Sequence, residues 1–447
     1  MKLLVHWEKA LLCLASILVL TRGSGAYSVL THEQVVDLLW VDRIQPMVTA
    51  RFPGLTDKQI QEAHAYAYGG SLIQDMGYYP FGNKYFSDLV HYVRSGDFVQ
   101  ALIQDSSDIN EYAFALGALA HYASDNSGHP TINNVVAIEF PRLRAKYGEQ
   151  VTYADDPKAH IRTEFGFDME QVAKNRYTSD QYHDFIGFAV SKPLLERAFF
   201  DTYDLKLEDV FGDVDLAIGS FRRAVSKFIP EMTRVALLSR KKQLVRDTPN
   251  FNEKKFRYYL SRVQYNKEWG SVYRKPGAGT RVLAFFLKLV PKVGPFQAVS
   301  FKIPTTQTED MYIKSVDRTV ENYASLLKET ADHRLDLPNT DCDTGKPTRA
   351  GEYKLSDATY AKLLDQLAQK DMAQIPTELR QDILEFYADP KAPIATKRDK
   401  KAWQKTTAEV EKLKAAPSLP TPSPLGSSPT EGAANQRHSD VERVGLL

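Results

Sequence analysis

The chain has 447 residues, of which 43% are hydrophobic and 25% are charged, which is enough for one large globular unit and a second one. The formal net charge of +1 excludes a global field that would draw the protein to nucleic acid or to anionic lipid. Any such attraction must therefore be local.

The first 26 residues have the pattern of a signal peptide. Lys2 gives a charged start, and an apolar run over residues 10–20 is too short to span a membrane. Small residues at positions 24–26 form a cleavage site. We predict export to the periplasm or to the outside of the cell, with Tyr27 as the first residue after cleavage. An uncleaved anchor is the alternative.

Helical periodicity dominates the rest of the chain, and the alternation typical of strands is scarce. Thr31 with Gln34, and Thr56 with Gln59, match the capping box at the start of a helix. Asp156 before Pro157 is a further start signal. We predict an all-α fold, a multihelical bundle with a C-terminal helical extension. Helices are expected over 87–93, 110–126, 168–175, 178–200, 214–240, 310–330 and 356–370.

The predicted organisation has three parts after the signal peptide. Residues 27–245 are expected to form the first domain, 246–415 a mostly helical region, and 416–447 a disordered tail rich in Pro and Ser. Cleavage would leave Cys342 as the one cysteine, so no intramolecular disulfide can form. A metal cluster could tie an exported chain together instead.

The strongest chemical pattern is His121, Asp125 and His129, which are four residues apart. Side chains at this spacing line one helix face as a ladder about 12 Å long. This length suits two or three ions with Asp125 bridging, whereas a solvated polar face is the alternative. Because Pro130 disfavours helical geometry before it, we expect the helix to end here with His129 at a frayed end.

Three weaker patterns accompany the ladder. His160 and Glu164 can chelate one metal from consecutive helical turns, although this pair also arises by chance. Asp75 stands between a helix and a loop rich in Gly and Pro, with His91 after it, and could equally cap a turn. The amine and carbonyl of Tyr27 could chelate metal with His32, or His32 could have no metal role. Together the nitrogen and carboxylate ligands suit zinc.

In this order the residues resemble the zinc-dependent phospholipase C family, whose superfamily includes trinuclear-zinc single-strand nucleases. The resemblance covers about residues 27–230, and the spacing from Asp125 to His129 is similar to that of the GPI-specific phospholipases. It implies up to three zinc ions and attack on phosphorus by metal-activated water, with Asp75 as a proposed general base. The implied zinc ligands are Asp75, His91, His121 and Asp125 at the first site, His129, His160 and Glu164 at the second, and Tyr27, His32 and Asp125 at the third.

Several features depart from the family or stand outside its pattern. Met76 follows Asp75 where choline-binding relatives carry an aromatic residue, which argues against a phosphatidylcholine preference. Aromatic residues at 78, 79 and 81 could form a substrate wall or simply pack the loop.

His64 and His183 match no motif position, and we predict that neither is a ligand. Residues 277–296 are apolar with basic flanks, and we favour a buried helix over peripheral membrane contact.

Three functions remain open from the sequence. The first is a phospholipase C-type phosphodiesterase acting on phospholipid or another phosphodiester, with no specific nucleic-acid partner. The second is a single-strand nuclease or nucleotidase on the same cluster. The third is a non-catalytic, zinc-stabilised binding module. The chain has no Gly-x-Ser-x-Gly motif and no phosphate-binding loop, which favours metal-assisted hydrolysis over nucleophilic catalysis by a serine.

Overall fold

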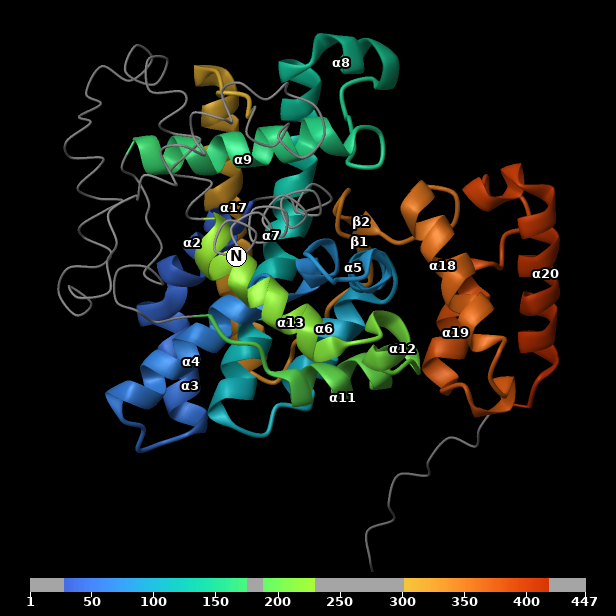
Figure 1. Cartoon of the computed structure of the whole chain (residues 1–447), viewed down its shortest axis with the longest axis horizontal. Coiled ribbons are helices and arrows are strands. Elements are labelled where there is room, and N and C mark those ends of the chain that lie inside the picture. The colour runs from blue at the N-terminus through green and yellow to red at the C-terminus, as the bar shows by residue number, and fades with distance from the viewer. Residues whose placement is uncertain (1–27, 175–187, 230–300, 418–447) are drawn as a thin grey trace, which may run out of the picture.

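The computed structural model describes residues 28–174, 188–229 and 301–417, and these are overwhelmingly helical (Figure 1). The one sheet in these ranges is a small antiparallel hairpin, β1 (Thr340–Asp341) with β2 (Lys346–Pro347). The predicted all-α fold is confirmed. The predicted signal peptide, segment 277–296 and nearly all of the tail lie outside the described residues. Among the residues that the structure describes, no helix is long and apolar enough to cross a membrane.

The helices before the first gap carry most of the predicted site. They are α2 (Val29–Leu39), the π-helix η2 (Trp40–Ile44), α3 (Gln45–Arg51), α4 (Asp57–Gly70), the 3-10 helix η3 (Ile73–Tyr78), α5 (Lys84–Tyr92), α6 (Ser95–Gln104), α7 (Ile109–Glu139), α8 (Pro141–Tyr147) and α9 (Pro157–Ala173).

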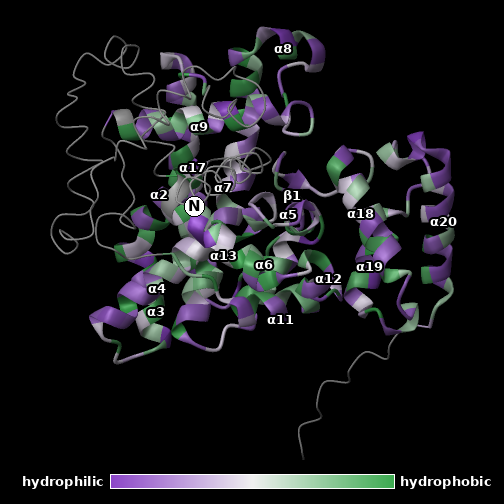
Figure 2. Ribbon diagram, in the orientation of Figure 1, coloured by the Kyte–Doolittle hydropathy of each residue, from purple (hydrophilic) through white to green (hydrophobic). Residues whose placement is uncertain are grey.

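The remaining helices flank this group. They are α11 (Lys192–Tyr203), α12 (Leu207–Phe211), α13 (Val214–Arg223), the π-helix η4 (Ala224–Phe228), α17 (Thr306–Ala331), α18 (Lys354–Leu367), η7 (Met372–Gln374), α19 (Thr377–Phe386), η8 (Ala395–Arg398) and α20 (Lys400–Ala415). Figure 2 shows apolar residues gathered around α6 and α11, where the bundle is packed.

Local start signals predicted two helices correctly and one incorrectly. The Thr56 capping box is present, and the Asp156 side chain accepts a hydrogen bond from the Ala159 amide. The predicted start at Thr31 is wrong, because α2 begins at Val29. Thr31 Oγ1 instead donates to Asp168 Oδ1 at 2.7 Å, so a contact with α9 decides how this residue is used.

Helix α7 runs through the centre of the fold and does not end near Pro130. It continues to Glu139, which corrects the expectation of a frayed end at His129. A proline inside a helix costs about 3 kcal/mol, and burial of most of α7 offsets this cost. The carbonyl of Asn126, which loses its helical donor at Pro130, faces Gly345 of the hairpin.

Two glycines let α4 and α7 cross with their backbones in contact. A Cβ atom at Gly117 would lie 2.0 Å from the Ala67 oxygen, and one at Gly70 would lie 1.9 Å from the Phe114 oxygen. The close crossing brings the end of α4, and with it the carbonyl of Ser71, beside His121 on α7. The fold therefore depends on side chains being absent at these two positions.

Helix α17 packs along α7 although it is far away in the sequence. Its Tyr323 donates a hydrogen bond to the Leu116 carbonyl at 2.8 Å, and its Tyr312 contacts Thr31 of α2. Helices α18, α19 and α20 form the group at the right of Figure 1, and α18 packs against α5. The predicted boundary near residue 245 lies outside the described residues and stays a prediction.

Candidate metal centre

Five elements direct eight predicted ligands into one buried region. His32 comes from α2, Asp75 from η3, His91 from α5, His121, Asp125 and His129 from α7, and His160 and Glu164 from α9. All eight are buried, and Asp75 is the most exposed at 8%. Burying so many ionisable groups is costly unless they pair or bind a cation. Tyr27 lies outside the described residues, so its role stays a prediction.

Asp125 lies at the middle of the region. Its Oδ2 atom is 3.1 Å from Nε2 of His121 and 3.2 Å from Nε2 of His91. Its Oδ1 atom is 3.6 Å from Nε2 of His32. A carboxylate with imidazole nitrogens beside both of its oxygens has the geometry of a ligand that bridges two ions.

Two groups of ligand atoms adjoin this carboxylate, each contained within 4.8 Å: Asp75 with His91 and His121, and His32 with His121 and Asp125. The rings of His32 and His121 stack with centroids 4.4 Å apart. Both groups include His121, so their ligand sets are joined.

A third group lies further along α7. One ligand atom each of His129, His160 and Glu164 lies within 4.8 Å of the others. His160 Nδ1 is 3.3 Å from Glu164 Oε1, and His129 Nε2 is 3.8 Å from Asp125 Oδ2. The helix that carries the ladder thus supplies ligands to all three groups.

Hydrogen bonds to the backbone set the tautomers of three histidines. His91 Nδ1 lies 2.7 Å from the Ser87 oxygen, and His121 Nδ1 lies 2.8 Å from the Ser71 oxygen. His160 uses Nε2 in the same way, 2.6 Å from the Val151 oxygen. Because a carbonyl oxygen only accepts, the bonded nitrogen carries the proton and the other nitrogen of a neutral ring presents a lone pair to the centre. Metal-ligating histidines are usually oriented in this way.

Burial also favours the neutral, metal-binding form of several rings. It lowers the pKa of His32, His129 and His160 below the usual value, and neighbouring histidines reinforce the shift at His32. For His91 the pKa is raised, because hydrogen bonding and attraction from Asp125 outweigh the effect of burial.

The carboxylates divide into two kinds. Burial raises the pKa of Asp75 and of Glu164, against the opposing attraction of His91 and His129 respectively. At Asp125 burial acts in the same direction, but His121 and the other histidines hold its pKa below the usual value. Asp125 is therefore the carboxylate most firmly kept as an anion, as a bridging ligand requires.

Comparison with known proteins gives a match in the same part of the chain. Residues 31–212 match the family model described as zinc dependent phospholipase C. This segment is similar to the zinc-dependent phospholipase C family. No curated protein and no solved structure matches the chain.

The residues present fit the zinc of the zinc-dependent phospholipase C family. The donors are imidazole nitrogens and carboxylate oxygens, the set that zinc uses when thiolates are absent. Several of these buried atoms have no hydrogen-bond partner among the described residues, including Oδ1 of Asp75 and both ring nitrogens of His129. Zinc binding would satisfy them.

Sequence reasoning missed one acidic residue at the centre. Asp343, in the hairpin between β1 and β2, has its Oδ1 atom 3.3 Å from Nε2 of His129. It lies beyond the end of the family match, and no ligand-type spacing marks it in the sequence. Only the folded arrangement of the hairpin against α7 reveals it.

The two predicted non-ligand histidines have different outcomes. His64 lies away from the ligand groups, stacked between Trp40 and Tyr68, with Nε2 3.1 Å from Asp37 Oδ1. These contacts explain its burial without a metal. His183 lies outside the described residues.

The aromatic loop after Asp75 is used in more than one way. Tyr78 is buried with its ring 6.2 Å from that of His91. Tyr79 packs edge-on against Phe221, whereas Phe81 is 60% exposed. One aromatic ring therefore lines the metal centre, a second packs the loop, and a third faces solvent.

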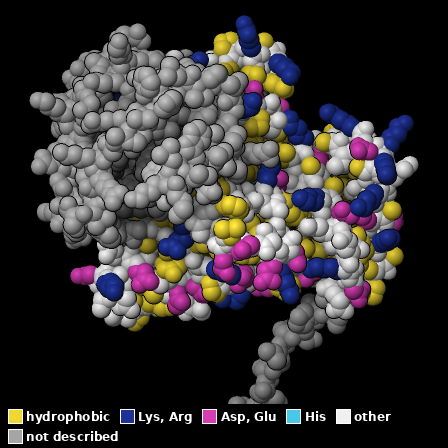
Figure 3. Space-filling model, in the orientation of Figure 1, with side chains coloured by type: hydrophobic (Ala, Val, Ile, Leu, Met, Phe, Trp, Pro, Cys, Tyr) yellow, Lys and Arg dark blue, Asp and Glu magenta, His cyan; other side chains and the backbone are white. Residues whose placement is uncertain are grey.

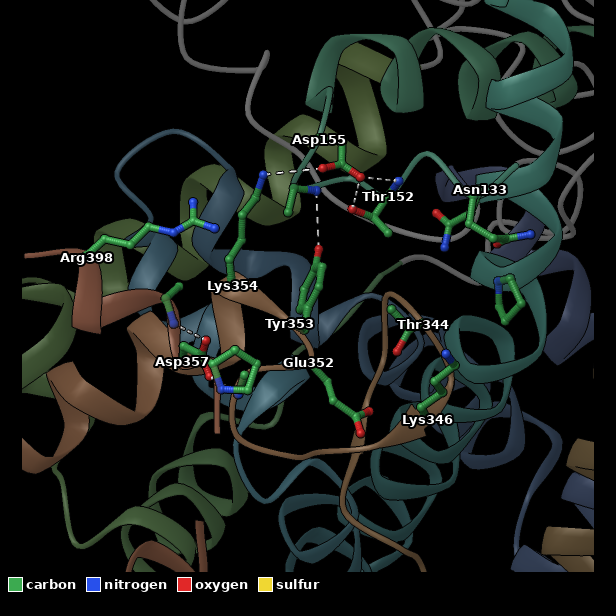
Figure 4. Close-up of a pocket in the computed structure, with 16 residues that line it drawn as sticks. Asn133, Thr152, Asp155, Thr344, Lys346, Glu352, Tyr353, Lys354, Asp357 and Arg398 are labelled. Carbon is green, nitrogen blue, oxygen red and sulfur yellow. Dashed lines mark hydrogen bonds and ion pairs between the residues drawn. The ribbon is translucent and has the colours of Figure 1, made fainter. Parts of the chain in front are cut away.

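A pocket of about 550 Å³ adjoins the hairpin (Figure 4). Its lining includes side chains of both charges. Lys354 lies 3.5 Å from Asp155, and Lys346, Glu352 and Arg398 also line the pocket. None of the eight predicted ligands in the described ranges lines it. Tyr353 connects it to the centre, because this residue lines the pocket and its hydroxyl donates to Asp343.

Proposed function

We propose that this chain is an exported zinc-dependent phosphodiesterase that hydrolyses phospholipid in the manner of a phospholipase C. The observation that carries the proposal is that Asp125 belongs to one group of ligand atoms and contacts His91 and His121 of a second group. Paired ions at such a site can stabilise both the attacking and the leaving oxygen of an in-line displacement at phosphorus. The export part rests on residues 1–26 of the sequence.

The ions and the protein would have different roles in the reaction. Bound zinc would supply Lewis-acid stabilisation and water that loses a proton near neutral pH. The backbone carbonyls of Ser71, Ser87 and Val151 hold the imidazoles in place. Met76 and Leu72, which are close to Asp75 in the sequence, are fully buried in the hydrophobic core.

Asp75 is our candidate for the general base. It is the most exposed of the eight residues, and its Oδ1 atom has no hydrogen-bond donor among the described residues. Burial raises the pKa of this carboxyl and so makes it a better proton acceptor. In this role it takes the proton of the attacking water.

We further propose that the mature N-terminus completes a third zinc site. His32 lies in the first turns of α2, whose start is fixed by Asp168: the Leu30 amide donates to Asp168 Oδ2 at 3.0 Å. A chain beginning at Tyr27 would have its amine only five residues before His32, so the amine could reach an ion that His32 binds.

Surface charge supports a lipid over a nucleic acid. On the face shown in Figure 3, Lys and Arg are interspersed with Asp and Glu over the described part of the surface, with no continuous basic track. The net charge of +1 likewise provides no general attraction for a polyanion. A nuclease acting on the same cluster is the second candidate, favoured by the aromatic ring of Tyr78 beside His91.

The test combines metal content with turnover. Zinc per chain is measured by elemental analysis of the purified protein, and hydrolysis of bis-p-nitrophenyl phosphate is followed with and without 1,10-phenanthroline. Phospholipid vesicles and single-stranded DNA are then compared as substrates. We expect two to three zinc ions per chain, chelator-sensitive turnover and release of diacylglycerol, with Asp75→Asn reducing kcat by about 100-fold or more.

Three other results would contradict the proposed function. Faster cleavage of DNA than of lipid would establish the nuclease. Bound zinc without turnover on any phosphodiester would point to the binding module. Absence of zinc would refute the metal chemistry altogether.

A further inference from the structure

A carboxylate from outside the segment that matches the family lies among the candidate zinc ligands. Asp343 is fully buried, and its Oδ1 atom is 3.3 Å from Nε2 of His129. Two ligands on one tetrahedral zinc, each about 2.0–2.1 Å from the ion, are about 3.3–3.4 Å apart. The observed separation is the one that two ligands of a single ion would have.

The other oxygen of Asp343 is fixed by two tyrosines. Its Oδ2 atom accepts hydrogen bonds from the hydroxyl of Tyr92, at 2.9 Å, and from that of Tyr353. No hydrogen-bond donor among the described residues reaches Oδ1. The carboxylate is therefore oriented with one oxygen held and the other free to bind a cation, as outer hydrogen bonds orient zinc ligands generally.

The hairpin that carries Asp343 is attached to the helices of the centre. The Cys342 amide donates to the carbonyl of His91, itself a predicted ligand, at 3.1 Å. Asn133 of α7 donates its Nδ2 hydrogen to the Asp343 carbonyl at 2.8 Å, and Ser95 of α6 donates to the Thr340 carbonyl at 2.6 Å. These bonds fix the hairpin at Asp343 and on the N-terminal side of it.

We propose that Asp343 is a fourth protein ligand of the zinc held by His129, His160 and Glu164. The inference rests on the zinc chemistry proposed above and adds a residue from beyond the family domain. Four protein ligands fill a tetrahedral site, whereas catalytic zinc usually keeps a position open. This ion would then bind substrate only by gaining a fifth ligand, and the ions near Asp75 would be the ones with open positions.

The test compares Asp343→Asn with Asp341→Asn in the full-length mature protein. Asp341 is buried in the same hairpin, and its oxygens accept from the Asp343 amide and the Thr344 hydroxyl. An asparagine there removes the same charge and keeps an acceptor for the turn. We expect Asp343→Asn to hold about one zinc fewer per chain than wild type after dialysis, and Asp341→Asn to match wild type.

Cobalt substitution provides a readout that does not depend on activity. The visible absorption of bound Co²⁺ reports coordination number, so losing one carboxylate should change the spectrum of Asp343→Asn and leave that of Asp341→Asn unchanged. Tyr353→Phe keeps the carboxylate but removes one hydroxyl that orients it. It should release one zinc about 10–100-fold more readily, which also covers the case in which Asp343→Asn does not fold.

The outcomes separate the two proposals. If wild type binds zinc and Asp343→Asn keeps the wild-type zinc content and cobalt spectrum, Asp343 lies beside His129 without binding the ion and the inference is wrong. If wild type binds no zinc, the proposed function itself fails. Equal zinc loss in both asparagine variants would assign the effect to the hairpin fold and overturn the ligand role.

Discussion

Asp125 is the residue on which the ligand groups converge. Histidines from α2, α5 and α7 surround its two oxygens at 3.1–3.6 Å. Removing one member of a buried charged network leaves the others without compensation, at a cost of about 3–5 kcal/mol. The effect of substituting this residue should therefore exceed that of any single histidine.

We predict that Asp125→Ala loses about two of the bound zinc ions and lowers the free energy of unfolding by about 3–5 kcal/mol. His64→Ala is the control, because it removes a side chain that is also buried and ionisable but contacts Trp40, Tyr68 and Asp37. It should lose stability but no zinc. Elemental analysis and urea unfolding check both, and zinc loss in the His64 variant alone would refute the assignment.

At the residue scale, helical spacing identified the candidate ligands of α7 and α9, and the family resemblance added His32, Asp75 and His91, but neither indicated Asp343. The four-residue spacing of His121, Asp125 and His129 places them on one face regardless of the rest of the fold. His160 and Glu164 follow the same rule. Asp343 has no such local relation to His129, because the hairpin reaches α7 only through tertiary contacts.

The crossing of α4 and α7 determines where the ligands of α7 lie. Their backbones touch at Gly70 and Gly117, and the Ser71 carbonyl that follows α4 orients His121. Any side chain at this crossing would push the helices apart and move that carbonyl away from the ring.

We predict that Gly117→Ala destabilises the protein by about 1–3 kcal/mol or more, and weakens zinc binding, because its Cβ would lie 2.0 Å from the Ala67 oxygen. Gly219 of α13 is the control, since nothing lies within 4 Å of a Cβ there. Gly219→Ala should instead stabilise the protein by about 0.5–1 kcal/mol, the difference in helix propensity. Thermal unfolding of both variants distinguishes packing from propensity, and equal shifts would contradict the close crossing.

Helix α19 carries a carboxyl whose titration should be visible in stability. Burial raises the pKa of Asp382 to about 6, against the attraction of Arg94, while Tyr360 donates a hydrogen bond to it at 3.0 Å. The folded state therefore binds a proton more tightly than the unfolded chain, where the pKa is about 3.9. The resulting stability is complete below pH 4 and is lost as the pH rises through 6.

We predict that Asp382→Asn, which stays neutral and can still accept from Tyr360, gains stability over wild type as the pH rises. The advantage should be larger at pH 7 than at pH 5, by on the order of 1 kcal/mol. Urea unfolding at the two pH values measures it. A difference that shrinks between pH 5 and pH 7 would show that the carboxyl has a lowered pKa instead.

Helix boundaries show why local signals only partly predict elements. The start of α4 at its capping box and that of α9 at Asp156 were predicted correctly, because the relevant hydrogen bonds are local. Thr31 was misassigned because Asp168 of α9 takes its hydroxyl. Pro130 did not end α7 because the helix is buried on both sides of it.

At the scale of the whole molecule, the all-α class follows from periodicity alone, whereas the arrangement does not. No local sequence pattern indicates that α17 lies along α7, or that the segment after α17 contacts the helices that carry the candidate ligands. These long-range contacts join the C-terminal region to the metal centre. Stability of the two regions should therefore be linked.

We predict that removing zinc with 1,10-phenanthroline lowers Tm in a single transition that includes α18, α19 and α20. A ligand present at 1,000 times its Kd stabilises the folded state by about 4 kcal/mol, so losing several ions should shift Tm by well over 5 °C. Calorimetry with and without chelator, followed by zinc addition, measures this. The same treatment of Asp125→Ala should have a smaller effect, and separate transitions would show that the regions are independent.

The position of Asp343 also concerns the order of events during synthesis. His32 and Asp343 are about 310 residues apart, and a ribosome adding about 5–20 residues per second needs about 15–60 s to pass from one to the other. In the later part of this interval, the helices of the family domain have been made but the hairpin that contacts His129 has not. If Asp343 binds zinc as proposed, the nascent chain holds an incomplete ligand set, and the complete centre forms only after most of the protein has been made.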